Sequence, residues 1–148
     1  MNILIDAFRY RVEQKQVQIY AFVIMPNHFH VIWTVLEPKS PADFQRDFLK
    51  ATAKRLLKNI SETEPNLLPK FISTQRDRKY HVWERRGLGI PIYKDEVLFQ
   101  KMNYIHYNPC NLKWKLADRP EDYFYSSAGF YLGGRNDFDF LTHIQYYR

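Results

Sequence analysis

The chain has 148 residues, a length typical of one domain, and 45% of them are hydrophobic, which is enough to build a core. Its net charge of +6 and its 17% aromatic content suit a polyanion whose bases can stack on rings, although many basic proteins bind no polyanion. The single cysteine, Cys110, excludes an internal disulfide and a cysteine-rich zinc site.

The N-terminal region predicts a helix over residues 2–13, because Leu4, Ala7 and Phe8 fall at helical spacing. Asp6 interrupts its apolar character, so the region does not resemble a signal peptide. No run of about 18 apolar residues follows that could span a membrane, and the cytoplasm is the simplest location to expect.

Two strands joined by a tight turn are predicted next. Hydrophobic residues alternate over residues 17–25, and the opposite face is also largely apolar, so we expect this strand to be covered on both sides. Pro26 and Asn27 are turn residues. The second strand then begins at His28 and ends near residue 37.

Two histidines open the second strand. Side chains alternate between the faces of a strand, so His28 and His30 share one face with Ile32, and Phe29 and Trp33 take the other. Two imidazoles on one rigid strand can hold a single metal ion. The alternative is a pair of surface histidines that bind nothing.

Ser40 and Pro41 predict the start of the clearest helix, since these residue types are favoured at the N-cap and at the first helical position. The later turns of this helix carry a cluster of basic residues. Phosphate contact is one role for that cluster, and a solvated face that compensates the helix dipole is the other. The residues assigned to DNA binding here are Lys50, Lys54 and Arg55.

Residues 60–79 contain two prolines and predict a loop or a short helix. A strand is predicted at residues 81–83, and residues 92–93 could pair as another. Basic residues interleave here with Tyr80 and Trp83, as in a single-stranded nucleic acid groove, and an edge strand protected by charge is the alternative. The residues assigned to DNA binding are Arg78, Lys79, Arg85 and Arg86.

A further helix is predicted from Asp95 to the residue before Pro109, because acidic residues favour helix starts and proline ends helices. Tyr104 and Asn108 are four residues apart and therefore lie on one face if the last turn holds. Tyr107 is rotated away from them. A single tyrosine on a helix is most often a half-buried packing residue.

Three stretches together resemble the single-tyrosine HUH transposases, a family that includes the enzymes associated with repeated extragenic palindromes. The first is residues 25–33, Met-Pro-Asn-His-Phe-His-Val-Ile-Trp, in which Phe29 is the bulky hydrophobic residue that the U denotes. The second is residues 104–109, Tyr-Ile-His-Tyr-Asn-Pro, which match a Tyr-Ile-x-x-Asn-Pro motif. In the third, residues 114–128, an Arg-Pro-Glu-x-Tyr run leads to a Ser-Ser pair.

The resemblance implies that Tyr104 is the nucleophile, with Tyr107 as the substitute candidate. Asn108 would complete a site with His28 and His30 for a divalent metal ion, Mg²⁺ or Mn²⁺. Tyr104 would attack a phosphodiester of single-stranded or hairpin DNA, keep the 5′ phosphate and release a 3′ hydroxyl, so that a strand can be cut and rejoined. Partner chains are not specified, and a homodimer is one option.

The expected fold is α/β (α+β), with one domain over residues 1–148. A central antiparallel sheet of the ferredoxin-like or RRM-like type would carry the histidine strand at its centre and helices on its faces. The family usually starts with a strand, whereas this chain begins in a helix, so the sheet lacks a strand, the start is truncated, or a partner supplies the edge. Arg119, Ser126 and Ser127 are expected to hold the helix or contact backbone.

Two other functions fit the same residues. A catalytically inactive or domesticated DNA-binding protein would bind single-stranded DNA without covalent capture. A metal-dependent phosphodiesterase would use the histidine pair and water, and would keep cleaving after Tyr104→Phe.

Overall fold

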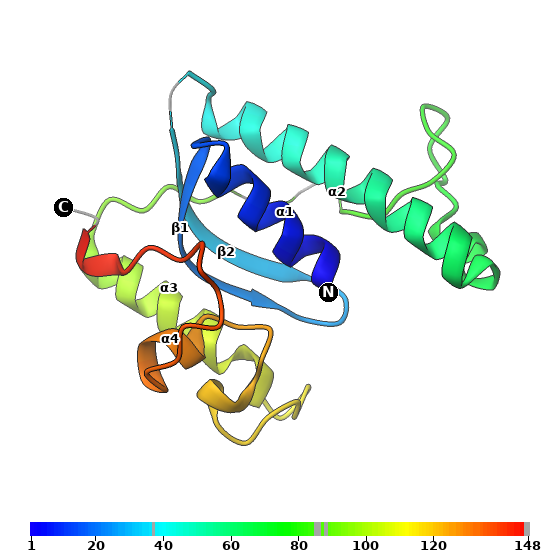
Figure 1. Ribbon diagram of the computed structural model, residues 1–148. Coiled ribbons are helices and arrows are strands. Elements are labelled where there is room, and N and C mark those ends of the chain that lie inside the picture. The colour runs from blue at the N-terminus through cyan, green and yellow to red at the C-terminus, as the bar shows by residue number, and fades with distance from the viewer. Residues whose placement is uncertain (37, 85–86, 88, 147–148) are drawn as a thin grey trace. The chain divides into compact units, whose positions relative to one another are not determined.

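The computed structural model describes residues 1–36, 38–84, 87 and 89–146 (Figure 1). Contacts divide the chain into two compact units, one of Met1–Lys39 with Pro91–Arg148 and one of Ser40–Ile90. In the part of the chain that is described, no helix combines the length and apolar character that a membrane crossing requires.

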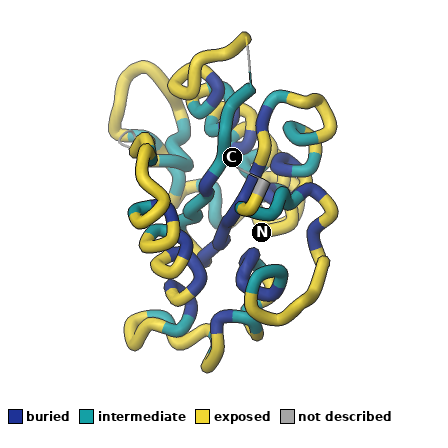
Figure 2. The backbone as a smooth tube through the Cα atoms, turned by 90° about the vertical axis from the view of Figure 1, so that its left-hand side faces the viewer, coloured by how far each residue is buried: buried dark blue, intermediate teal, exposed yellow. Residues whose placement is uncertain are grey.

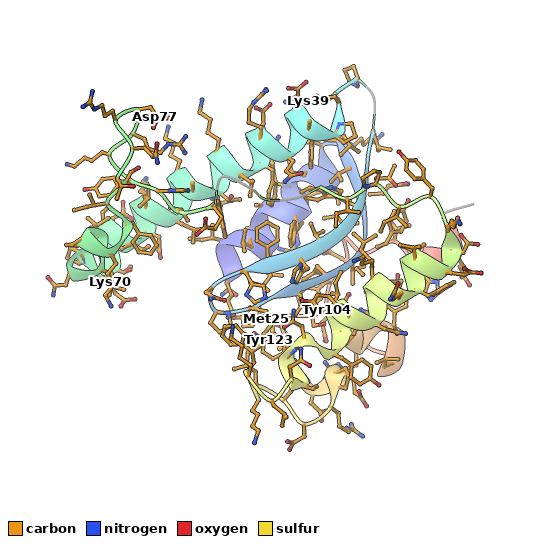
Figure 3. All side chains as sticks on the ribbon, turned by 180° about the vertical axis from the view of Figure 1, so that it is seen from behind. Met25, Lys39, Lys70, Asp77, Tyr104 and Tyr123 are labelled. Carbon is orange, nitrogen blue, oxygen red and sulfur yellow. The ribbon has the colours of Figure 1, made fainter. Side chains whose placement is uncertain are left out.

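The first unit is a β-hairpin with a helix on each face. One helix, α1, lies in front of the hairpin in Figure 1, and α3 lies in front of it in Figure 3, where the view is reversed. The helices predicted at residues 2–13 and from Asp95, and the two strands of the hairpin, are confirmed with small shifts of their ends, whereas the strand suggested at residues 92–93 of this unit does not form. The elements are α1 (Asn2–Glu13), β1 (Val17–Ile24), β2 (Phe29–Val35), α3 (Asp95–Tyr107) and α4 (Ala128–Leu132), with 3₁₀ turns at Asn108–Cys110, Pro120–Asp122 and Ile144–Tyr146.

Helix α1 ends in a tight reversal that leads into β1. The N–H of Gln16 donates to the Arg11 carbonyl at 3.1 Å, and the N–H of Lys15 donates to the Val12 carbonyl at 2.9 Å. This pair of bonds is the Schellman motif, whose turning residue adopts a left-handed conformation. Here that residue is Lys15, with φ of 54° where glycine is usual.

The two strands pair in antiparallel register, with Val17 opposite Val35 and Ile24 opposite Phe29. The α+β class and the antiparallel pairing are therefore as predicted. The sheet formed by the described residues has two strands, so the prediction that the histidine strand lies at the centre of a larger sheet is wrong.

C-terminal segments occupy the other edge of β1. Because seven of its eight residues are buried, its backbone groups need hydrogen-bond partners on both edges. This strand, and not the histidine strand, thus takes the inner position. The bonds run from Ile24 N–H to Tyr125 O (2.8 Å), from Ser127 N–H to Phe22 O (2.9 Å) and from Thr142 N–H to Ile19 O (2.8 Å).

The core lies on both faces of the hairpin, and Figure 2 shows buried backbone running along it. On the α3 face, Ile32 of β2 packs in a cluster with Leu98, Met102 and Ile105. On the α1 face, aromatic rings meet: the centroids of Phe8 and Phe22 are 5.7 Å apart. The tail, for which the sequence suggested no role, completes this face through Phe138 and Phe140.

The second unit is organised on α2 (Pro41–Thr63), followed by a 3₁₀ helix (Pro65–Phe71). The predicted helix start is confirmed, since the Ser40 hydroxyl accepts the N–H of Asp43 at 3.1 Å and Pro41 is the first helical residue. Of the loop or short helix predicted over residues 60–79, a 3₁₀ helix forms at Pro65–Phe71.

The strand predicted at residues 81–83 does not form. The indole N–H of Trp83 instead donates to the Thr52 hydroxyl of α2 at 3.1 Å, and the Trp83 carbonyl is bonded to the His81 ring. The backbone pairing described just before Trp83 is an isolated bridge between Ile72 and Tyr80, and the N–H of His81 donates to the Phe71 carbonyl at 2.7 Å. Residues 92–93 are irregular as well.

Candidate active site

The two histidines lie at the turn end of the hairpin and share one face, as the strand pattern predicts. Their ring centroids are 5.1 Å apart. Phe29, between them, points to the opposite face, where its ring lies 6.1 Å from that of Phe8 in α1. The imidazoles therefore face α3.

Helix α3 brings the tyrosine motif to the histidines. The ring of Tyr104 lies edge-on to His30, with centroids 5.4 Å apart. One turn later, Asn108 is buried at 3% exposure. Tyr107 on the same helix is exposed and points elsewhere, since it does not line the cleft that contains the other four residues.

That cleft is open and has a volume of about 440 Å³. It lies where the end of α3 passes the hairpin turn, near the labels of Tyr104 and Met25 in Figure 3. The structure thus gathers the four residues assigned to catalysis and metal binding. Four more lining residues were not assigned to the site from the sequence, although Asn27 and Trp114 lie inside two of the three stretches and Lys113 directly precedes the third. The lining residues are Asn27, His28, His30, Tyr104, Asn108, Asn111, Lys113 and Trp114.

Both imidazoles are held in the neutral form that a metal ion requires. Burial lowers the pKa of His28, and the nearby charge of Lys113 adds to the effect. Burial also lowers the pKa of His30, with smaller contributions from His28 and Lys101. At neutral pH each ring therefore has a nitrogen lone pair to offer.

Asn27 selects which nitrogen of His28 is available. The Nδ1 atom of His28 lies 2.6 Å from the amide oxygen of Asn27. An amide oxygen only accepts, so Nδ1 carries the proton and Nε2 is left with the lone pair. Metal-binding histidines usually have such a partner on their other nitrogen.

The donor set fits a divalent ion. Two imidazoles that bind one ion at about 2.1 Å have ring centres about 5 Å apart, as His28 and His30 do. Among the described residues no group of three or more His, Cys, Asp or Glu could hold a metal. The third ligand that the resemblance implies, the amide of Asn108, lines the same cleft. Such a set is neutral and would leave the full charge of the ion for an anionic substrate.

A buried hydrogen-bond network ties the last turn of α3 to β1. The Nε2 atom of His106 lies 2.8 Å from the Ser127 hydroxyl. That hydroxyl also accepts the N–H of Phe22 at 2.9 Å and donates to the Phe22 carbonyl at 3.2 Å. His106 and Ser127 are thus hydrogen-bonded to each other in the interior, and burial lowers the pKa of His106 to about 4. Ser127 holds the helix as expected, whereas Arg119 pairs with Asp122 on the surface.

The basic residues assigned to DNA binding belong to the second unit, whereas the cleft belongs to the first. Those on α2 and in the loop between residues 71 and 81 are exposed. In the loop, Arg78 pairs with Asp77 at 3.2 Å, and the Lys79 ammonium lies 5.3 Å from the Tyr80 ring centroid. Arg85 and Arg86 lie outside the described residues. The exposed residues are Lys50, Lys54, Arg55, Arg78 and Lys79.

No family model matches this chain, and neither the curated proteins nor the solved structures gave a significant match. The function is therefore inferred from the chemistry of the cleft.

Proposed function

We propose that this protein is a DNA transposase of the single-tyrosine HUH type, a metal-assisted single-strand endonuclease and ligase with Tyr104 as its nucleophile. One observation carries the proposal: two motifs far apart in the sequence place His28, His30, Tyr104 and Asn108 around one cleft. A fold of the ferredoxin-like type and action in the cytoplasm are parts of the same proposal.

The reaction is a transesterification at phosphorus. The Tyr104 oxygen attacks a phosphodiester of single-stranded DNA, an O–P bond to tyrosine forms, and the bond to the 3′ oxygen breaks. The 3′ oxygen leaves as a hydroxyl, and the phenol proton passes to water, which reaches this side chain because it is 55% exposed. One ester replaces another, so the strand can be rejoined by the reverse step without an energy-rich cofactor.

His28, His30 and Asn108 would hold a divalent ion, Mg²⁺ or Mn²⁺. When bound, the ion supplies Lewis-acid stabilisation of the charge that develops on the phosphate oxygens. Asn27 keeps the His28 ring in the required tautomer. The bond between His106 and Ser127 keeps the end of α3, and with it Tyr104, against the hairpin.

A covalent-capture experiment tests the proposal. A library of 3′-labelled single-stranded hairpins is incubated with the protein and Mn²⁺ and run on a denaturing gel. We expect a labelled protein–DNA adduct that disappears in Tyr104→Phe and persists in the matched control Tyr107→Phe, because the two tyrosines are equally exposed but only Tyr104 lines the cleft.

Other outcomes would identify the competing functions. Cleavage that survives Tyr104→Phe without an adduct would indicate a phosphodiesterase that uses water. Binding without cleavage would indicate an inactive DNA-binding relative of the fold. Mapping of the adduct to Tyr107 would overturn the assignment of the nucleophile.

A further inference from the structure

A sharp turn after α3 carries Lys113 and Trp114 into the cleft. The N–H of Trp114 and that of Lys115 both donate to the Asn111 carbonyl at 2.9 Å. Lys115 then turns the chain with φ of 44°, a left-handed conformation that is unfavourable for a residue with a Cβ atom. The surrounding bonds stabilise this turn, so the position of Lys113 and Trp114 is built into the fold.

The ammonium group of Lys113 is held over an aromatic ring at the edge of the histidine site. It lies 5.2 Å from the centroid of Trp114, a distance within the range of cation–π attraction. The Trp114 ring in turn lies 5.6 Å from that of His28. The other side of Trp114 packs against the core cluster, which keeps the indole in place.

The charge of Lys113 has no anionic partner among the described residues. No ion pair joins it to a carboxylate there, and none of the eight residues lining the cleft is acidic. A cation directed into a cleft without acids attracts anions, and a phosphate group is the anion that suits it.

We propose that Lys113, positioned by the Trp114 ring, is the phosphate-binding residue of this cleft and contacts the DNA backbone beside the phosphodiester that Tyr104 attacks. The inference rests on the proposed function, since it takes single-stranded DNA as the substrate. It gives Lys113 and Trp114 roles that the sequence patterns did not assign to them. Lys113 contacts the substrate, and Trp114 acts through Lys113.

The salt dependence of binding tests this role without cleavage. Tyr104→Phe protein in EDTA is titrated into a fluorescein-labelled single-stranded hairpin, and anisotropy is measured between about 50 and 200 mM salt. The logarithm of the binding constant falls linearly with the logarithm of the salt concentration, and loss of one phosphate contact to a single strand makes this slope shallower by about 0.7. At 0.1 M salt such a loss lowers the affinity about fivefold. We expect this change for Lys113→Ala.

Lys115→Ala is the matched control, because it removes the same charge from the same turn but outside the cleft. We expect it to keep the slope. Trp114→Phe should also keep the slope, since phenylalanine retains an aromatic face for the ammonium group. Trp114→Leu should have a shallower slope. Thermal melts verify that both variants fold. Equal slopes for Trp114→Leu and Trp114→Phe would remove the positioning role of the indole.

The outcomes separate this inference from the proposed function. Covalent capture by the wild-type protein, together with equal slopes for Lys113→Ala and Lys115→Ala, would overturn the role of Lys113 alone. A slope change specific to Lys113→Ala without covalent capture would support the phosphate contact and overturn the transposase. Absence of any binding to single-stranded DNA would overturn both.

Discussion

Acidification from pH 7 to about 4.5 should destabilise the fold through His106. This side chain is 3% exposed, and burial lowers its pKa from 6.5 to about 4. In the unfolded chain the same imidazole takes up its proton near the usual value. Between these two values the unfolded state binds more protons than the folded state, so the free energy of unfolding decreases as the pH falls.

The difference between the two pKa values sets the size of the effect. Each pKa unit corresponds to about 1.4 kcal/mol, so the full effect of His106 is about 3.5 kcal/mol when the pH falls from above 6.5 to below 4. At about pH 4.5 most of it should have developed. That is a large part of the total stability of a domain of this size.

Urea denaturation at a series of pH values measures the effect. His106→Gln is the matched variant, because a glutamine amide can donate to Ser127 but does not titrate. The stability of the wild type should fall faster than that of His106→Gln between pH 6.5 and about 4.5, while contributions from all other groups cancel in the comparison. Parallel curves, or an NMR titration of His106 with a midpoint near 6.5, would refute the argument.

Three further predictions concern the metal site, a turn and the core. His28→Ala or His30→Ala should abolish cleavage and weaken Mn²⁺ binding while DNA binding persists; unchanged cleavage kinetics in either variant would exclude the site. Lys15→Gly should raise the free energy of unfolding by about 1 kcal/mol, because glycine adopts the left-handed conformation without cost, and Lys15→Ala should not. Phe8→Ala should lower the free energy of unfolding, measured by urea denaturation, by about 3–5 kcal/mol, because the ring is fully buried among other rings. Phe99→Ala, on the exposed face of α3, should change it by less than about 1 kcal/mol. A loss of equal size in both phenylalanine variants would contradict the assignment of the core.

Local patterns in the sequence were enough to place most of the elements. The cap formed by Ser40 and Pro41 acts within one turn of α2, and the face shared by His28 and His30 follows from the geometry of a single strand. Pro109 ends α3 for an equally local reason, because it has no N–H to continue the helical hydrogen bonds, and the chain passes into a 3₁₀ turn at Asn108. Local geometry paired the two histidines, whereas the roles of Tyr104 and Asn108 came from the resemblance of their motif to a known family.

The tertiary structure decided what depends on distant partners. The strand expected around Trp83 is absent, and the indole instead anchors this segment to Thr52 of α2. The inner position in the sheet goes to β1 because the C-terminal segments bond to its free edge. Lys113 joins the cleft only through the turn at Lys115, whose left-handed conformation no pattern of residue types predicts. Periodicity and capping report forces within a few residues, whereas these features arise from hydrogen bonds and packing between segments that meet only in the folded chain.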